Sequence, residues 1–311
     1  MIQTPWGSLP VADAHVHFFS HRFFASLAEQ KGIPQDRLAP LLKWQLPAED
    51  PRQLSDAWAH ELDKYGVEKA ALIASIPGDG ESVITAVQHH PERFYGYMMV
   101  NPAAPAGVEQ VAAQVESALA SGYIQALCFF PAMHRYSIQD ERAVALLELL
   151  ATRPRTLAFV HCGVLSVGVR KVLGLPSPFD MKFSNPIDLH AVALRFPQLR
   201  FVLPHFGAGY LREALMLCDL CPNVYLDTSS SNSWIRYEEA HLDLRTVFRR
   251  ALDVAGPQRL LFGTDSSFFP RGWNASVFET QSKALYEIGV TEEVARLVLH
   301  DNLVRLFSET K

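Results

Sequence analysis

The feature that most constrains the fold is a regular alternation of short apolar runs with longer amphipathic stretches. The runs are rich in β-branched and aromatic residues, which is typical of buried strands. The stretches between them repeat apolar residues every three or four positions, as helices do. Near-continuous hydrophobicity along a strand indicates a parallel sheet that is covered on both faces. Eight such runs occur, at residues 11–18, 69–77, 93–102, 124–132, 156–163, 200–207, 223–230 and 260–267.

Eight strand–helix units are the number that closes a TIM (β/α)8 barrel, so we predict one α/β barrel domain over residues 1–311. Two segments exceed the regular spacing, namely residues 19–51 after the first strand and 164–183 after the fifth. Both follow the carboxyl ends of strands, and we therefore expect a distorted barrel with insertions at its catalytic face. An extra C-terminal helix is expected to begin at the capping residue Thr291 and to pack across the outside of the barrel.

Charge and composition argue against several classes of partner. The formal net charge is -5 and no block of like charges occurs, which argues against a nucleic acid or an acidic membrane surface. The first residues lack the pattern of a signal peptide, and no apolar run approaches the roughly 18 residues of a membrane span. Four cysteines in a chain of this length do not indicate a disulfide framework. We therefore expect a cytoplasmic protein with a small-molecule substrate, and the sequence leaves a homodimer open.

Two histidines lie two positions apart in the first apolar run, "VADAHVHF". Residues i and i+2 of a strand point to the same face, so His15 and His17 project together. At the end of the first barrel strand that face is the interior mouth, where such a pair is able to bind one metal ion. An isolated H-x-H pattern is more often part of a half-exposed strand, and the interpretation therefore depends on the other strands.

Three further polar residues end predicted strands: His161 the fifth, His205 the sixth and Asp265 the eighth. All three are therefore expected at the catalytic face of the barrel. A buried imidazole or carboxylate must be paired or bind a metal, because an unpartnered buried polar group is costly. Each histidine taken singly is equally well explained as a satisfied core residue. Five convergent groups predict a metal site.

The sequence resembles the amidohydrolase superfamily. The resemblance lies in the motifs "DAHVHF", "FVHCG", "LPHFGAGYL", "LFGTDSSF" and "DNLVRLF". The sequence is most similar to the amidohydrolase-related branch that contains aminocarboxymuconate semialdehyde decarboxylase, across essentially the whole chain. The resemblance implies one divalent metal ion, usually Zn2+ with Mn2+, Fe2+ or Co2+ as alternatives, bound by His15, His17, His161 and Asp265. It also implies His205 as an acid/base or oxyanion group. Binuclear relatives carry a carboxylated lysine on the fourth strand, and since residues 124–132 contain no lysine, a single ion is favoured.

Such a site predicts a metal-dependent hydrolase of a small organic acid, amide or lactone that works through a metal-activated water. A zinc ion lowers the pKa of bound water to about 7. Asp265 is expected to orient that water or take its proton, and His205 to polarise a carbonyl or protonate a leaving group. Spacing alone leaves both a ligand and a catalytic role for His205. For an anionic substrate the candidate cationic partners are Arg170 and Arg271, in the loops after the fifth and eighth strands.

Two other functions are consistent with the sequence. A mononuclear, non-oxidative decarboxylase of an unsaturated or aromatic acid would use the same residues and metal ion. In that enzyme His205 and Asp265 would control protonation at carbon. The third function is a metal-free lactonase, or a barrel that binds a ligand without turning it over. The complete set of candidate metal ligands argues against this third function. The identity of the substrate depends on loop shape, which one sequence does not specify.

Overall fold

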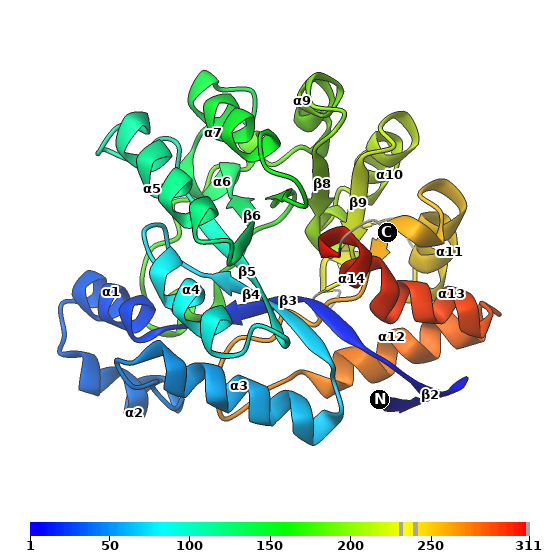
Figure 1. Cartoon of the computed structure of the whole chain (residues 1–311), viewed down its shortest axis with the longest axis horizontal. Coiled ribbons are helices and arrows are strands. Elements are labelled where there is room, and N and C mark those ends of the chain that lie inside the picture. Colours follow the sequence, from blue (N-terminus) through cyan, green and yellow to red (C-terminus); the bar gives the residue numbers. More distant parts are fainter. Residues whose placement is uncertain (230–232, 239–241, 309–311) are drawn as a thin grey trace.

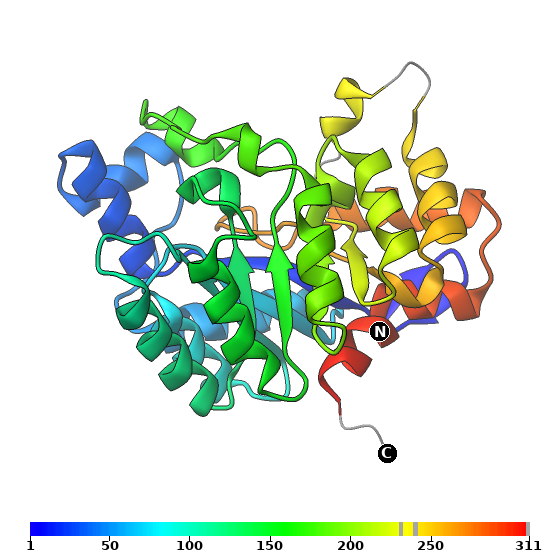
Figure 2. The same ribbon diagram turned by 90° about the horizontal axis from the view of Figure 1, so that it is seen from above.

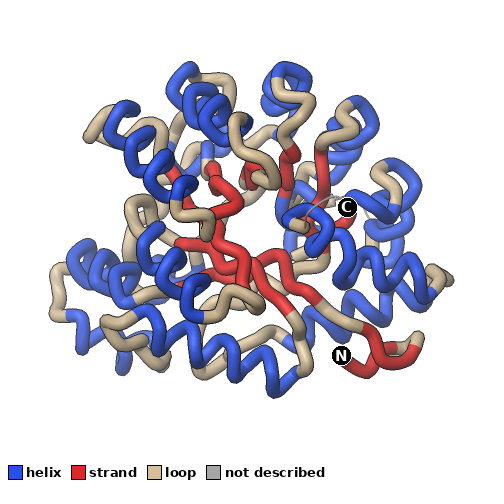
Figure 3. Tube along the Cα trace, in the orientation of Figure 1, coloured by secondary structure: helices blue, strands red, loops and turns tan. Residues whose placement is uncertain are grey.

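The computed structural model describes residues 1–229, 233–238 and 242–308, and its centre is an eight-stranded parallel sheet with helices around it (Figures 1 and 3). The strands follow one another in sequence order, so the predicted (β/α)8 barrel is confirmed. Each predicted run contains one strand; only Ser230, at the end of the seventh run, lies outside the described residues. The strands are β3 (Ala12–Phe18), β4 (Lys69–Ala74), β5 (Phe94–Val100), β6 (Ile124–Phe129), β7 (Leu157–Val160), β8 (Arg200–Leu203), β9 (Val224–Asp227) and β10 (Leu260–Leu261).

One main helix follows each barrel strand and covers the outside of the sheet (Figure 1). Their amphipathic sequences bury one face against the strands, which explains why the strands themselves are apolar on both faces. The helices are α3 (Pro51–Tyr65), α4 (Gly80–His89), α5 (Val108–Ala120), α7 (Glu141–Ala151), α9 (His190–Arg195), α10 (Leu211–Leu220), α11 (Leu244–Val254) and α12 (Ala275–Glu287).

A bulge in β3 decides which of its side chains face the barrel interior. Ala14 packs in the interior cluster, whereas Val16 packs in the outer cluster between strands and helices. In a regular strand these two residues would point the same way. The register of β3 against β4 shifts between Asp13 and Val16, and this bulge reverses the alternation. As a result His15 and His17 line the interior mouth.

The barrel closes between its first and last strands through a few specific hydrogen bonds. The backbone N–H of Ala14 donates to the carbonyl of Phe262 at 2.8 Å, and that of His17 donates to Ser266 at 2.7 Å. The buried carboxylate of Asp13 accepts hydrogen bonds from the side chains of Thr264 and Trp273, which follow β10. Closure therefore brings the end of the last strand against the two histidines of the first.

The two predicted insertions pack against each other at the carboxyl ends of the strands. The first carries α1 (His21–Lys31), a turn (Gln35–Arg37) and α2 (Leu38–Leu42); the second carries α8 (Gly168–Val172) and a turn (Met181–Phe183). Their apolar side chains form a separate cluster, in which Phe24 and Leu38 pack with Val169 and Leu173. Figure 2 shows the strand arrows pointing toward these segments. The insertions thus form a wall at one end of the barrel. The short helix α6 (Pro131–His134) follows β6 on the same side.

The C-terminal segment packs on the outside of the barrel, as expected, only in its first part, where Ala295, Val298 and Leu299 belong to the outer cluster. It consists of α13 (Glu292–Arg296), a π-helical turn (Leu297–Asp301) and α14 (Asn302–Phe307), and Thr291 caps its start as predicted. Leu303 and Leu306 of α14 are buried in the interior cluster, together with residues at the beginning of the strands such as Ala12. Figure 2 shows α14, in red, at the end opposite the insertions. The helix closes the floor of the barrel because its apolar face completes the interior core.

A short N-terminal hairpin, β1 (Ile2–Thr4) with β2 (Gly7–Leu9), precedes the barrel and was not predicted. Its Gly7 has φ of +108°, a conformation that favours glycine and permits the tight turn. No helix within the described part of the chain is long and apolar enough to cross a membrane.

Candidate metal centre and its cavity

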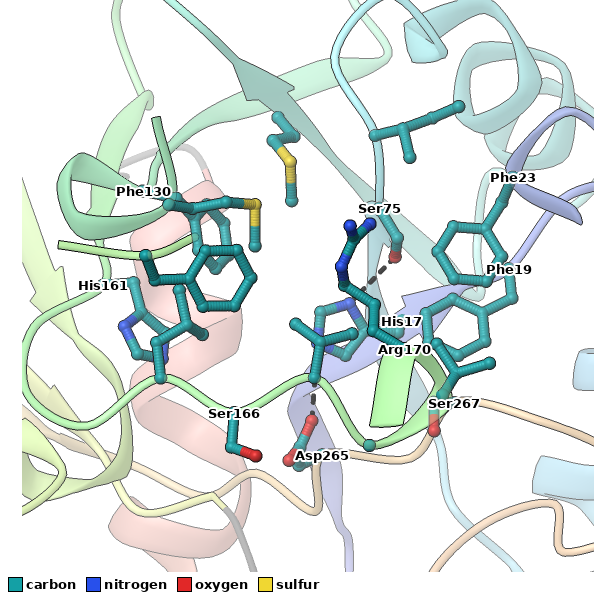
Figure 4. Close-up of a pocket in the computed structure, with 18 of the residues that line it drawn as sticks. His17, Phe19, Phe23, Ser75, Phe130, His161, Ser166, Arg170, Asp265 and Ser267 are labelled. Atoms are coloured by element: carbon teal, nitrogen blue, oxygen red, sulfur yellow. Dashed lines mark hydrogen bonds and ion pairs between the residues drawn. The ribbon is translucent and has the colours of Figure 1, made fainter. Parts of the chain in front are cut away.

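Three predicted ligands, His15, His17 and Asp265, meet at the mouth of the barrel. The Nε2 atoms of the two histidines are 3.4 Å apart. The carboxylate oxygen Oδ1 of Asp265 lies 3.4 Å from Nε2 of His17 and 3.7 Å from Nε2 of His15. Figure 4 shows His17 between Ser75 and Asp265. Three donor atoms from the first and last strands thus form one compact group.

Hydrogen bonds to the other ring nitrogen fix the proton of each of these histidines. Nδ1 of His15 donates to the carboxylate of Asp227 at 2.7 Å, at the end of β9. The hydroxyl of Ser75 donates to the carbonyl of Ile73, so it accepts the Nδ1 proton of His17 at 2.9 Å. Both imidazoles, when neutral, therefore carry their proton on Nδ1 and present an unprotonated Nε2 to the common point.

This arrangement fits a divalent metal ion. At 3.4 Å the two Nε2 atoms are close enough to share one cation, either a proton in a hydrogen bond or a metal ion. In a tetrahedral site with bonds of 2.0–2.1 Å, neighbouring donor atoms are about 3.3–3.4 Å apart. The observed separations of 3.4, 3.4 and 3.7 Å match that requirement. A carboxylate that orients a metal-binding histidine through Nδ1, as Asp227 does, is also a recurring feature of such sites.

His161 lines the same cavity but is not a member of the three-atom group. It lies just after β7, its ring stacks on Phe130 with centroids 5.2 Å apart, and its centroid is 5.3 Å from that of His205. Its Nδ1 is buried and has no hydrogen-bond partner among the residues described. Burial holds the pKa of His161 well below its usual value, with the nearby His205 and His15 adding to the effect. A role as fourth ligand remains a prediction.

His205 lies beside the ligand group with a defined orientation. It has φ of +58°, and Nδ1 donates to the carbonyl of Ser229 at 3.1 Å, which leaves Nε2 unprotonated on the cavity side. The hydroxyl of Ser229 lies 2.9 Å from Nδ1 of both His205 and His15, and so connects the two rings. Burial lowers the pKa of His205, and proximity to His15 lowers it further. A neutral imidazole with a free Nε2 is able to accept a proton.

Asp265 is held as a carboxylate at the edge of the cavity, 37% exposed. It has φ of +57°, a conformation that is costly for a non-glycine residue and is often found at functional sites. Burial would raise its pKa, but the hydrogen bond with His17 and the proximity of the His15 and His205 rings outweigh burial and hold the pKa well below its usual value. The group is therefore ionised throughout the neutral range and available as a ligand.

The ligand group opens into a cavity of about 910 Å³, large enough for a small organic molecule. Aromatic side chains from the first insertion and the β10–α12 loop line one wall. The rings of Phe19 and Phe23 stack at 4.0 Å, and those of Trp44 and Phe268 at 3.9 Å. The guanidinium of Arg271 lies over Phe268, 4.6 Å from the ring centre. This wall is rigid because its members stack on one another.

The two predicted cationic residues differ in how far they are already engaged. Arg170, labelled in Figure 4, donates Nε and Nη2 to the carbonyl of Pro176 and Nη1 to Gln30 of α1. Arg271 donates only Nη2, to the backbone carbonyl of Asp265 and to Ser267, as far as the described residues show. Both line the cavity. Among the described residues Arg271 therefore retains donors for a ligand, whereas Arg170 ties the two insertions together.

Sequence analysis missed three residues that position the histidines: Asp227, Ser229 and Ser75. Asp227 carried a usable signal, since it is a charged residue at the end of the apolar run "NVYLDTSS". Ser75 and Ser229 follow strands as well, but serine is common in loops and nothing in the sequence distinguishes these two.

The fold and the site together define a (β/α)8 barrel with a histidine–carboxylate ligand group at the carboxyl ends of its strands. The model of the amidohydrolase family matches residues 12–308, and the chain belongs to this family.

Comparison with individual proteins shows more distant likeness. A segment of 87 residues is 34% identical to Protein fluG of Emericella nidulans; it covers 28% of this chain and 10% of that protein, so the chain spans about a tenth of this curated relative. A probable 2-pyrone-4,6-dicarboxylic acid hydrolase of Acinetobacter baumannii, solved with citric acid bound, is 15% identical with a TM-score of 0.60, over 96% of this chain and 99% of that chain. An amidohydrolase of Burkholderia multivorans, solved with bound zinc, has the same identity, TM-score and coverage. These structures share the fold.

Proposed function

We propose that this protein is a metal-dependent hydrolase that cleaves an amide or lactone of a small organic acid with an activated water. The observation that carries the proposal is the close group of three donor atoms: Nε2 of His15 and Nε2 of His17 lie 3.4 Å apart, and Oδ1 of Asp265 lies 3.7 Å and 3.4 Å from them. Membership of the amidohydrolase family and the zinc found in the Burkholderia multivorans structure support it. A single ion follows from a single group of ligand atoms within the described part of the cavity.

His15, His17 and Asp265 would hold the ion, and His161 is the proposed fourth ligand. The ion, most simply Zn2+ with Mn2+, Fe2+ or Co2+ as alternatives, supplies a Lewis acid that makes water nucleophilic at neutral pH. Asp227 and Ser75 keep the two β3 histidines in the tautomer that ligation requires.

His205 is the proposed general acid/base. Its Nδ1 proton is committed to the carbonyl of Ser229, so Nε2 enters the reaction as a proton acceptor. Burial keeps its pKa below the usual value, and the ring is therefore neutral at the start of the reaction. After accepting the proton of water, the same nitrogen can give it to the departing amine or alcohol. Asp265 contributes by orienting the water beside it.

Arg271 is the proposed binding group for a carboxylate of the substrate. Its face rests on Phe268, which is itself stacked on Trp44, so the guanidinium is held in one plane before the substrate arrives. Preorganisation of this kind reduces the entropy lost on binding. Arg170 remains a second candidate that must first release its contacts with Pro176 and Gln30.

The test is a two-stage experiment on the purified, zinc-loaded protein. By elemental mass spectrometry, His17→Ala should contain one equivalent of metal less than wild type. A panel of small lactones and amides is then assayed in oxygen-18 water, and the label should appear in the product carboxylate. Release of carbon dioxide without incorporation of the label would contradict the hydrolase proposal and indicate a decarboxylase.

A further inference from the structure

A second group of potential metal ligands lies on the outer surface, between α3 and α4. It consists of Asp56 on α3, His89 at the end of α4 and His90, which caps that helix. The two helices lie side by side on the outside of the barrel (Figure 1). None of the three residues lines the cavity. The group is therefore separate from the candidate metal centre described above.

The ligand atoms of this surface group converge on one point. Nε2 of His89 and Nε2 of His90 lie 2.9 Å and 2.8 Å from the same oxygen, Oδ1 of Asp56. Successive side chains of a helix diverge by about 100° around its axis. The two histidines converge because His90 leaves the helix with φ of −133° and ψ of 66°, which brings the ring centroids to 4.6 Å.

The surrounding contacts hold the two halves of this group in register. The buried hydroxyl of Ser55, next to Asp56, donates to the carbonyl of Ala86 on α4 at 2.8 Å. Further along, Arg93 after α4 pairs with Asp63 of α3 at 2.6 Å. The backbones that carry the ligands are thus fixed on both sides, while the ligand side chains remain accessible. Side-chain exposure is 36% for His89, 30% for His90 and 58% for Asp56.

The donor set is one that first-row transition metals prefer. Two imidazole nitrogens and one carboxylate oxygen suit Zn2+, Co2+ or Ni2+, with the remaining positions filled by water. Replacing the two N–H···O hydrogen bonds by metal bonds requires the donor atoms to move apart by about half an ångström, to the 3.3–3.4 Å of a tetrahedral site. Exposed side chains on a fixed backbone are able to make this adjustment at little cost.

We propose that Asp56, His89 and His90 form a second binding site for a divalent transition-metal ion, on the surface and independent of the cavity. The ion would link α3 to the end of α4 and stabilise the folded chain, since a ligand that binds only the folded state stabilises it. The chain would then bind two equivalents of zinc, of which only one serves the cavity.

The test is zinc binding to the tag-free chain after removal of metal by a chelator. Equilibrium dialysis against zinc chloride, read by elemental mass spectrometry, should give two equivalents for wild type. One equivalent is expected for the H89Q/H90Q double variant, and one for His17→Ala. His190→Gln, at the start of α9, is the matched control and should retain two.

The difference between wild type and H89Q/H90Q reports the surface site alone, so the outcome does not depend on the proposed enzyme function. Equal zinc content in these two proteins would overturn the proposal. Far-ultraviolet circular dichroism checks that each variant is folded, and the thermal transition provides a second reading. Added zinc should raise the melting temperature of His17→Ala but not that of a His17→Ala, His89→Gln, His90→Gln triple variant. Equal shifts in both would also overturn the proposal.

Discussion

The carboxylate of Asp227 lies 2.7 Å from Nδ1 of His15, and both side chains are fully buried. This contact spans the barrel from the seventh strand to the first and sets the tautomer of a candidate metal ligand. Asp227→Asn replaces a charged acceptor by an amide of the same size. We expect zinc affinity of the cavity site to fall about 10- to 100-fold, the range found when such partners are removed.

Competition with a chromophoric chelator, in the H89Q/H90Q background, measures this affinity without interference from the surface group. Asp219→Asn, an exposed carboxylate on α10, is the matched control and should leave affinity unchanged. Unchanged affinity in Asp227→Asn would mean that the contact with His15 serves the fold rather than the metal.

His205→Asn separates the catalytic role of this residue from a ligand role. Asparagine keeps a hydrogen bond to Ser229 within reach but has no group that accepts and returns a proton. We expect near-normal metal content and a fall in kcat of about 10²- to 10⁴-fold, the usual contribution of general acid–base catalysis. Metal content and steady-state turnover are measured on the same preparation. Loss of the metal would instead make His205 a ligand.

Arg271→Gln tests recognition of a substrate carboxylate. Loss of a charge-assisted, preorganised contact should raise KM for an anionic substrate by about tenfold or more and leave KM for a neutral ester or amide analogue unchanged. Arg170→Gln is the matched comparison, because its donors are already bonded to Pro176 and Gln30. A larger rise of KM in Arg170→Gln than in Arg271→Gln would reverse the assignment.

The buried side chain of His134 should make the free energy of unfolding depend on pH. Burial lowers its pKa from 6.5 to about 4. As pH falls below 6.5, the unfolded chain binds a proton that the folded chain does not, so stability is full above pH 6.5 and decreases toward pH 4. From pH 8 to pH 5 this residue should cost about 2 kcal/mol. The free energy of unfolding is measured with urea at both pH values. The decrease of about 2 kcal/mol that His134 causes should be absent in His134→Gln and present in His60→Gln.

Leu303→Ala tests the floor of the barrel. Leu303 is 1% exposed and packs with the interior residues of the strands. Truncation leaves a cavity, and the free energy of unfolding should fall by about 2–5 kcal/mol. Leu220→Ala, at a leucine that is 58% exposed, should change it by less than about 0.5 kcal/mol. The free energies of unfolding are measured by urea titration. If Leu303→Ala lowered this energy as little as Leu220→Ala does, α14 would not contribute to the packing of the barrel core.

Much of the fold was predictable because it depends on local composition. All eight strands were located, since strands buried on both faces must be apolar throughout. The clustering of His15, His17 and Asp265 also followed from topology, because the carboxyl ends of parallel strands meet at one end of the barrel. Only α14 was misplaced, because an amphipathic pattern shows which face of a helix is buried but not which surface covers it.

The sequence by itself determined the class of fold and the residue types that carry the chemistry, since periodicity and strand-end position are properties of the chain. Tertiary structure alone decided the rest. The bulge in β3 turns His15 and His17 inward, and Asp227 and Ser75 assign their protons. Contacts with Pro176 and Gln30 occupy Arg170, while Arg271 keeps donors that no residue in the described part of the chain accepts. These features depend on distances between residues far apart in the chain, and no local pattern encodes such distances.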